Sequence, residues 1–418
     1  MLLRSTIAST FAFLLTIASL HAADFAKTDW PHWRGPNNNN VAVEGQTPPT
    51  NFGPSSNVLW KTPIPGRGHS TPTIVGDKIF LATADEDRKI QGVIAFDRKT
   101  GKQAWIKEIS RGGFPPVHPK NTYASGTIAA SPDQLFITFH HDDLLTLASL
   151  DHSGKPLWSI EAGPYAPRVY EYGYAPSPLL YKNMVIIAAD YEKGGYLAAF
   201  DQKTGKQVWK TQRPNFLSFS SPIVCNVAGK DQLVISGCER VSSYDPNTGK
   251  ELWSTPGTTM ATCGTVVWND DTIFASGGYP KPQTIAVKAD GSNQVLWSNP
   301  QKCYEQSMLA HNGYIYAFTD NGILFCWRAS DGKEMWKQRK AGPVSASPIL
   351  VGDNIYATNE LGQTWVFKAS PDSYQEVAEN KLGDESFASL VIADSKIYTR
   401  IAVQENGKRQ EYLYCFGQ

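Results

Sequence analysis

The chain alternates short apolar runs with short polar turns over most of its length. Between Thr71 and Trp105, the apolar runs 72–75, 79–82 and 93–96 are separated by turn residues, and a last run ends at Trp105. Runs of about four apolar residues bounded by Gly, Asp and Lys are typical of β-strands joined by tight turns. The pattern therefore predicts four short strands in this stretch.

The end of this stretch is a phrase that the chain repeats. It reads AFDRKTGKQAW at 95–105, AFDQKTGKQVW at 199–209 and SYDPNTGKELW at 243–253, and looser copies end at Trp158, Trp297 and Trp336. Self-similarity at a period of roughly 40–50 residues indicates an array of one supersecondary unit. In each copy the Asp can cap a turn, the Gly supplies its positive φ, and the Trp packs between neighbouring sheets. We expect the repeated residues to build the fold, so function should lie where the repeats differ.

A count of the units predicts an all-β fold. Small residues open each first strand, and the units begin near 70, 125, 175, 220, 262, 307, 345 and 387. The eighth unit shows three strands and lacks the fourth, whereas 58–61 forms an orphan fourth strand near the N-terminus. Pairing the two closes a ring and removes its exposed edges. The sequence thus predicts an eight-bladed β-propeller of four-stranded blades, closed by an N-terminal strand.

Two segments precede the predicted propeller, which spans 58–418. Residues 1–22 read as a signal peptide, because Arg4 precedes the apolar run 7–20 and small residues follow it. Residues 23–57 read as an N-terminal strap on the surface. The first Cys is Cys225, so we expect no lipid anchor, and no later stretch is apolar enough for a membrane span. We expect an exported protein, periplasmic or extracellular.

Charge and cysteine content narrow the function classes. The chain has 39 basic and 39 acidic residues, which argues against nucleic acid or an anionic membrane as the main partner. The six cysteines lie at least 13 residues apart and form no CxxC-type metal pattern. We expect buried free thiols or at most one disulfide.

The repeated phrase resembles the tryptophan-docking repeat of quinoprotein dehydrogenases. It is also similar to the wider family of pyrroloquinoline-quinone-like (PQQ-like) repeat propellers that bind no quinone, including the propeller subunit of the outer-membrane β-barrel assembly machinery. The resemblance covers about 58–416 and implies the fold. The dehydrogenases of this family carry a pair of adjacent cysteines under the quinone and hold calcium through a Glu, an Asn and an Asp. This chain has no adjacent cysteines, and that triad is not assignable in it. We therefore expect no cofactor, and PQQ with calcium is the alternative.

Candidate binding residues lie in the connections between units. The connections 110–124 and 161–174 are longer than closure of a ring requires, and such length usually signals a binding surface. We predict that one polar, aromatic pocket at the channel mouth is lined by Arg67, His69, His118, Asn121, Tyr123, Arg168, Tyr174 and Glu305. The alternative is that these are ordinary loop residues packing on one another.

Two acidic or His-rich loops are weak candidates for metal. His140, His141, Asp142 and Asp143 are consecutive, and neighbours at a strand end point in opposite directions, so four such ligands rarely converge. The acidic tip 85–87 is a similar case. No metal site is predicted, and no catalytic residue can be named.

Three functions follow. The leading one is a non-enzymatic exported scaffold that binds a protein, peptide or glycan at its channel mouth. The first alternative is a PQQ-dependent or other periplasmic oxidoreductase, and the second is a polysaccharide-active hydrolase or lyase, which carboxylate pairs facing each other across the channel would support.

Overall fold

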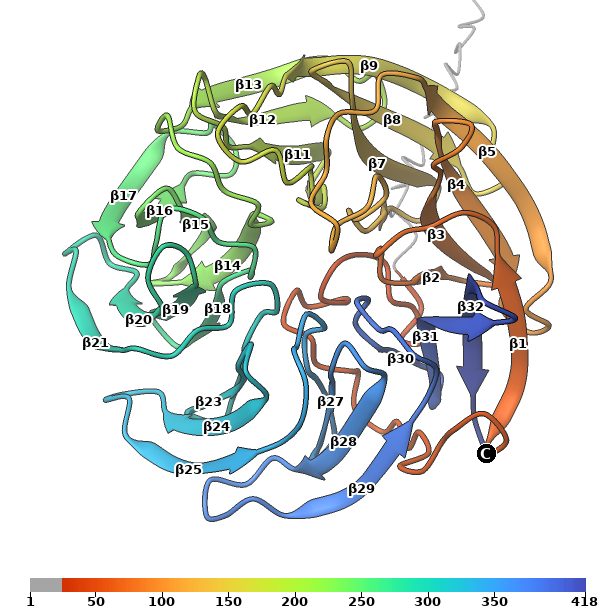
Figure 1. Ribbon diagram of the computed structural model, residues 1–418. Helices are drawn as coiled ribbons and strands as arrows, with labels where there is room; N and C mark the ends of the chain where they lie inside the picture. Colours follow the sequence, from red (N-terminus) through yellow and green to blue (C-terminus); the bar gives the residue numbers. More distant parts are fainter. Residues whose placement is uncertain (1–24) are drawn as a thin grey trace, which may run out of the picture.

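The computed structural model describes residues 25–418, so the predicted signal peptide, 1–22, lies outside the described residues. Residues 25–418 contain no helix and form eight four-stranded antiparallel sheets, which stand as blades around a ring (Figure 1). The predicted eight-bladed β-propeller is confirmed. Within each of blades one to seven the four strands follow one another in chain order, from β2–β5 in blade one to β26–β29 in blade seven.

The strands have the following bounds: β1 Val58–Ile64, β2 Thr73–Val75, β3 Lys78–Asp85, β4 Ile90–Asp97, β5 Gln103–Arg111, β6 Ala129–Ala130, β7 Gln134–His141, β8 Leu144–Asp151, β9 Pro156–Pro164, β10 Leu179–Tyr181, β11 Met184–Ala189, β12 Tyr196–Asp201, β13 Gln207–Gln212, β14 Ile223–Val227, β15 Lys230–Gly237, β16 Arg240–Tyr244, β17 Glu251–Pro256, β18 Val267–Asn269, β19 Thr272–Gly277, β20 Gln283–Lys288, β21 Val295–Asn299, β22 Leu309–His311, β23 Tyr314–Phe318, β24 Ile323–Arg328, β25 Glu334–Arg339, β26 Ile349–Val351, β27 Asn354–Thr358, β28 Gln363–Lys368, β29 Glu376–Lys381, β30 Val391–Ala393, β31 Lys396–Glu405 and β32 Lys408–Phe416.

Blade eight is built from both ends of the described chain. Its order is β1-β32-β31-β30, and β1 pairs antiparallel with β32, with Trp60 opposite Cys415 and Ile64 opposite Glu411. The predicted closure by an N-terminal strand is therefore confirmed. Because the outermost strand of the last blade comes from the start of the ring, neither end leaves a blade incomplete.

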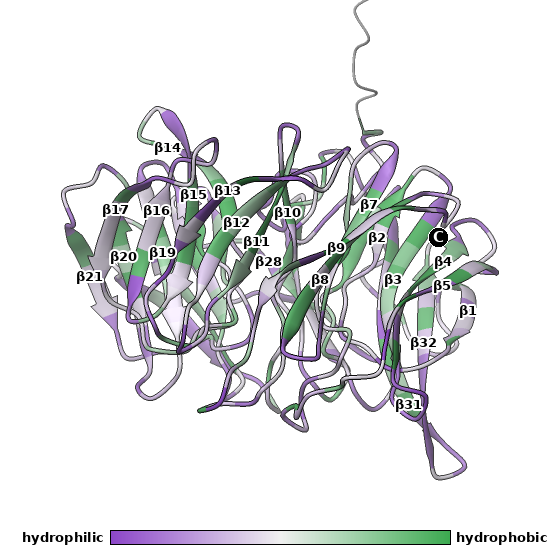
Figure 2. Ribbon diagram, turned by 90° about the horizontal axis from the view of Figure 1, so that it is seen from above, coloured by the Kyte–Doolittle hydropathy of each residue, from purple (hydrophilic) through white to green (hydrophobic). Residues whose placement is uncertain are grey.

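Burial changes from the axis of the ring outward. The middle strands are buried on both faces, as in β3 and β4, because each blade is covered by its two neighbours. The outer strand β5 alternates between exposed and half-buried residues. Figure 2 shows the same trend, with hydrophobic residues along the strands and hydrophilic loops on both faces of the ring. The innermost strands are short, and β6 has only two residues, both alanine.

Part of the predicted strap, residues 30–42, does not lie on the surface. Trp30 forms a β-bridge with Ile74 of β2, and Val41 forms one with Leu350 of β26, so 30–42 crosses the ring on the axis side of two innermost strands. Trp30 is 1% exposed and Arg34 is fully buried. We call 30–42 the base segment; Figure 1 shows this part of the chain (red) near the centre of the ring. Its polar composition is compatible with burial because its side chains bond to backbone of the blades.

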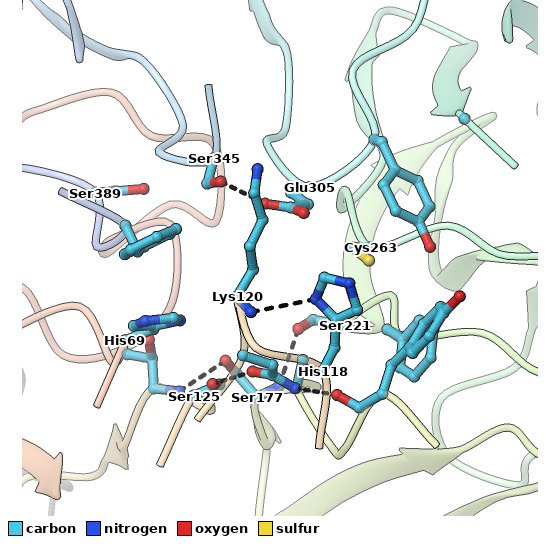
Figure 3. A pocket seen from close by; sticks show the side chains of 18 of the residues that line it. His69, His118, Lys120, Ser125, Ser177, Ser221, Cys263, Glu305, Ser345 and Ser389 are labelled. Atoms are coloured by element: carbon cyan, nitrogen blue, oxygen red, sulfur yellow. Dashed lines mark hydrogen bonds between the residues drawn. The ribbon is translucent and has the colours of Figure 1, made fainter. Parts of the chain in front are cut away.

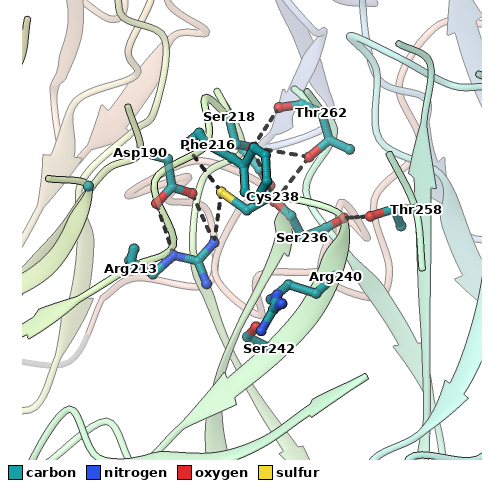
Figure 4. A network of polar contacts seen from close by, with 12 residues as sticks. Asp190, Arg213, Phe216, Ser218, Ser236, Cys238, Arg240, Ser242, Thr258 and Thr262 are labelled. Atoms are coloured by element: carbon teal, nitrogen blue, oxygen red, sulfur yellow. Dashed lines mark hydrogen bonds and ion pairs between the residues drawn. The ribbon is translucent and has the colours of Figure 1, made fainter. Parts of the chain in front are cut away.

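A buried ion pair joins blades three and four (Figure 4). Asp190, just after β11, accepts two hydrogen bonds from Arg213, each 2.9 Å long. Arg213 also donates to the Tyr244 hydroxyl of β16 at 2.9 Å. A buried pair of this kind is costly to break because the remaining charge would be left unpaired. We assign the network a role in holding the two blades together.

The cysteines of the described residues are all free thiols. Five are buried and Cys263 is partly exposed, which agrees with the expectation of buried free thiols. Between residues 25 and 418 no helix is long and apolar enough to cross a membrane.

Candidate functional site

The connections between blades lie on the same face of the ring as the loops between the second and third strands of each blade. On this face they surround a cavity of about 330 Å³. Trp33 of the base segment forms its floor, because this segment enters from the opposite face. There Asp29 accepts a hydrogen bond from the Gly76 amide in the β2–β3 turn. The base segment thus lies across the lower end of the central channel, and the cavity lies above it. We call this face the mouth (Figure 3).

A ring of hydroxyl groups supports the cavity. Each blade places a Ser or Thr two residues before its first strand: Thr71, Thr127, Ser177, Ser221, Thr265, Ser307, Ser347 and Ser389. The backbone amide of one such residue donates to the hydroxyl of the next blade's residue, as Ser177 does to Ser221 at 2.9 Å and Ser307 to Ser347 at 2.9 Å. The Thr265 hydroxyl accepts a 2.9 Å hydrogen bond from the Trp33 indole instead of one from a backbone amide of this ring. These bonds explain why small hydroxyl residues begin the first strands.

Aromatic side chains form much of the wall. Tyr172 and Phe219 stack with ring centroids 6.0 Å apart, and His118 meets Tyr172 edge-on at 5.1 Å. On another side His69 stacks on Phe387 at 4.3 Å. The aromatic lining as a whole consists of Trp33, His69, His118, Tyr172, Phe219, Tyr279, Tyr304 and Phe387. Such walls, with a few placed polar groups, are typical of ligand sites.

Two glutamates from neighbouring blades share one serine at the mouth. Ser345 forms hydrogen bonds with Glu305 and, at 2.7 Å, with Glu360. Burial raises the pKa of Glu305 above its ordinary value. A serine hydroxyl carries one proton, so both bonds form together only when one carboxyl is protonated. Burial thus favours the protonated form of Glu305.

Two lysines balance the carboxylates of this wall. Lys120 reaches from the β5–β6 connection to Glu360 of the β27–β28 loop, with Nζ 3.0 Å from Oε1. Lys302 lies 3.2 Å from Asp320, which also accepts the Tyr304 amide at 2.8 Å. The wall is therefore a mixed-charge surface with more carboxylates than lysines.

Four of the predicted mouth residues line the cavity: His69, His118, Asn121 and Glu305. Burial, together with Arg67, Arg400 and Arg409, holds the pKa of His69 well below its ordinary value, so this ring is neutral at pH 7. Asn121 donates to the Tyr172 carbonyl at 2.7 Å and positions that ring. Whether these four residues bind a ligand remains a prediction.

The other four predicted residues do not line the cavity. Arg67 pairs with Glu86 on the rim, and Arg168 pairs with Asp143 on an exposed loop. Tyr123 donates to the Pro115 carbonyl within its own connection. Tyr174 is buried between blades and donates to the Ala188 carbonyl. All eight predicted residues lie before the first strand of a blade. The loops that carry them are irregular, however, and turn four of these side chains away from the cavity.

Sequence reasoning missed Lys120, Tyr172, Lys302 and Tyr304, each within three residues of a predicted one. The long connections correctly indicated where the site lies. The sequence did not show which residues within them face the cavity. The mouth also takes Glu360 from a loop inside blade seven and Trp33 from the base segment, and no feature of the sequence places either one at the mouth.

The residues at the mouth do not fit calcium with PQQ. No three His, Cys, Asp or Glu side chains among residues 25–418 cluster as metal ligands would. Glu360 and Asp320 are each paired with a lysine ammonium, so a metal cation would have to displace that ammonium to bind either carboxylate. Cys263 is the one cysteine on the wall, and burial raises its pKa, so it is neither paired nor a ready thiolate. The His140–Asp143 stretch is likewise divided, since His140 is buried whereas His141 binds Asp142 and Thr146 near the surface.

Eight four-stranded blades, seven of which carry the repeated tryptophan on their outer strand, define a PQQ-like repeat propeller. The model of the family described as outer membrane protein assembly factor BamB matches residues 52–117, 93–338 and 309–371, and the chain belongs to this family.

Curated relatives fall into two functional groups. The chain is 26% identical to the outer membrane protein assembly factor BamB of Burkholderia pseudomallei over 209 residues, which cover 48% of each chain. It is also 26% identical to the quinoprotein ethanol dehydrogenase of Pseudomonas aeruginosa over 294 residues, which cover 64% of this chain and 44% of the dehydrogenase. The matches thus span about half of each relative or less. A europium-containing methanol dehydrogenase shares the fold, with a TM-score of 0.68, 12% identity, and coverage of 94% of this chain and 98% of that chain.

Proposed function

We propose that the protein is an exported, non-enzymatic binding protein that receives a segment of a partner protein in the cavity at its mouth. The observation that carries the proposal is the aromatic cavity closed below by the protein's own Trp33. A cavity with one opening accepts a side chain or a chain end, whereas an open channel would not retain it. A relative named as an assembly factor, which acts through association, supports the same conclusion.

The carboxylates favour binding over hydrolysis. Glu305 and Glu360 lie on the same side of the mouth and both bond to the Ser345 hydroxyl, which occupies the space between them. Glycosidases place two carboxyl groups on opposite sides of a bond, roughly 5–9.5 Å apart. The pair at this mouth leaves no room for a sugar linkage between its members.

Selection from a random-peptide display library tests the proposal. Peptides selected on the wild-type protein should bind Tyr172→Ala or Tyr279→Ala with affinity lower by about tenfold, because aromatic anchors dominate such interfaces. Tyr181→Ala is the matched control, because this tyrosine bonds to Asp231 at the other end of the blades. Peptides that bind all three variants equally would refute the mouth as the binding face.

A redox enzyme is the second candidate, because the match to the quinoprotein ethanol dehydrogenase extends over 64% of this chain. Titration with PQQ and millimolar calcium, followed by absorbance and calorimetry, separates the candidates. We expect no saturable binding, because lysines already neutralise the mouth carboxylates. Stoichiometric binding that is lost in Glu305→Gln would favour the redox function instead.

A further inference from the structure

Lys120 spans the mouth from one side to the other. It leaves the connection between blades one and two, and its ammonium bonds to Glu360 in blade seven. Figure 3 shows the Lys120 side chain extended toward Ser345 and Glu305. The Lys120 side chain is 46% exposed, whereas that of Glu360 is 9% exposed. The carboxylate is thus fixed in the wall, and the cation that meets it stands on a long, solvated arm.

The wall holds three carboxyl groups, Glu305, Glu360 and Asp320, but only two lysines among the described residues. Lys302 is paired with Asp320, so Lys120 is the cation nearest to both remaining carboxyls, Glu305 and Glu360. Lys120 bonds to Glu360 and acts on Glu305 only through space. A second cation would therefore have a carboxyl partner already positioned by Ser345.

The neighbouring aromatic rings suit a cation as well. Tyr172, Phe219 and Tyr279 line the same cavity, and Lys302 already lies 5.9 Å from the centroid of the Tyr304 ring. The faces of aromatic rings carry negative potential and attract ammonium and guanidinium groups, most strongly where water is excluded. The cavity combines these faces with carboxyls at one edge.

We infer that the mouth binds a ligand through an ammonium or guanidinium group seated against Glu305 and Glu360, and that Lys120 occupies this position when no ligand is bound. The inference rests on the proposed binding function and names the chemistry of what is bound. The ligand's cation displaces Lys120, whose half-exposed ion pair is weak and whose arm can turn into solvent. On a protein partner the group is a lysine or arginine side chain; on a small ligand it is an amine.

Removal of the Lys120 ammonium should change ligand affinity in opposite directions for cationic and anionic ligands. If the ligand is cationic, Lys120 competes with it, so removing the ammonium should strengthen binding. If the ligand is anionic, Lys120 is part of the site, so its removal should weaken binding. Lys120→Met keeps most of the aliphatic arm and is the variant of choice, because its half-exposed position makes loss of folding a minor concern.

The experiment uses three aromatic probes of similar shape and different charge: 2-phenylethylamine, 2-phenylethanol and phenylacetate. Binding is measured by NMR line broadening and calorimetry on the full chain. We expect 2-phenylethylamine to bind best, Lys120→Met to tighten it severalfold, and Glu305→Gln or Glu360→Gln to weaken it by about tenfold, the size of a lost charged hydrogen bond. Capped dipeptides with lysine or norleucine beside phenylalanine then distinguish a peptide side chain from a free amine.

The pH dependence supplies a second readout. Because burial raises the pKa of Glu305, affinity for the amine should increase as pH rises and this carboxyl loses its proton. Lys120, Lys302, His69 and His118 also line the cavity, and Glu360 and Asp320 pair with its two lysines. The pH profile is therefore compared with that of Glu305→Gln, which should be flatter. Tighter binding of phenylacetate than of the amine, weaker amine binding in Lys120→Met, or no binding of any probe would overturn the inference. The peptide selection with Tyr172→Ala would still decide the proposed function by itself.

Discussion

At the scale of single residues, the repeated phrase forms the contact between neighbouring blades. The Trp158 indole of blade two donates to the Gln202 carbonyl of blade three at 2.9 Å, and Trp297 of blade five donates to the Ala329 carbonyl of blade six at 2.8 Å. Trp253 departs from the pattern and bonds to Gln232 of its own blade at 2.7 Å. Blade five, which faces Trp253, has a lengthened turn near Gly291 in place of the usual turn. The indole therefore does not bond to a turn carbonyl of the next blade.

The glycine of the phrase is the other half of this contact. Gly249 has φ +71°, and a Cβ there would lie 2.4 Å from the Trp209 ring. Gly229 has φ +73° in the same blade and nothing within 4 Å of a Cβ, which makes it a matched control. We expect Gly229→Ala to cost about 1 kcal/mol from backbone strain alone. Gly249→Ala should cost about 1–3 kcal/mol more, because the methyl group overpacks the ring.

Urea denaturation of both variants measures the difference. Equal losses of stability would show that the tryptophan side chain shifts to accommodate the added methyl group. Docking between the blades would then not require glycine at position 249.

At the scale of elements, the base segment belongs to the core although it precedes the ring. Trp30 packs with residues of blades one, seven and eight, including Ile74, Ile349 and Leu390. Its neighbour Trp33 reaches the hydroxyl of Thr265 on blade five. One short segment therefore contacts blades on several sides of the axis, which a strap on the outer surface could not do.

Truncation of Trp30 tests this integration. We expect Trp30→Ala to lower the free energy of unfolding by about 3–5 kcal/mol, the usual loss for a buried aromatic residue. Val208→Ala is the control, because Val208 is 50% exposed on an outer strand and should change stability by less than about 0.5 kcal/mol. Similar losses in guanidinium denaturation would mean that the base segment does not pack into the ring in solution.

At the scale of the whole molecule, the ring depends on β1. The outer edge of β32 is covered by β1 through pairs from Val58 opposite Phe416 to Ile64 opposite Glu411. An uncovered β32 would present unpaired backbone groups, which favour pairing with other chains. The same closure keeps the mouth at a fixed size, since all eight blades contribute to it.

Two chains that differ only in β1 isolate its effect. A chain in which 58–64 is replaced by a Gly-Ser linker of equal length should unfold at lower temperature and self-associate, whereas the unaltered chain, which keeps the same base segment, should remain monomeric. Size-exclusion chromatography with light scattering and thermal unfolding monitor both. Identical behaviour would show that seven complete blades and a three-stranded eighth close the ring without β1.

The sequence by itself determined the local elements and their number. Short continuous apolar runs, turn residues at fixed offsets and a returning Trp depend on local interactions, and they predicted the strands, the eight blades and the closing strand. Small residues before each first strand were also visible, although their hydroxyl ring was not.

Only the tertiary structure decided the composition of the mouth and the course of the base segment. The mouth joins Lys120, Glu305 and Glu360, residues up to 240 positions apart, from loops in which no periodicity states which side chain faces the axis. The base segment is polar in composition, and its burial depends on partners such as Met308 and Pro348 that accept its hydrogen bonds. Both are consequences of ring closure, which brings distant loops and the start of the chain to one axis.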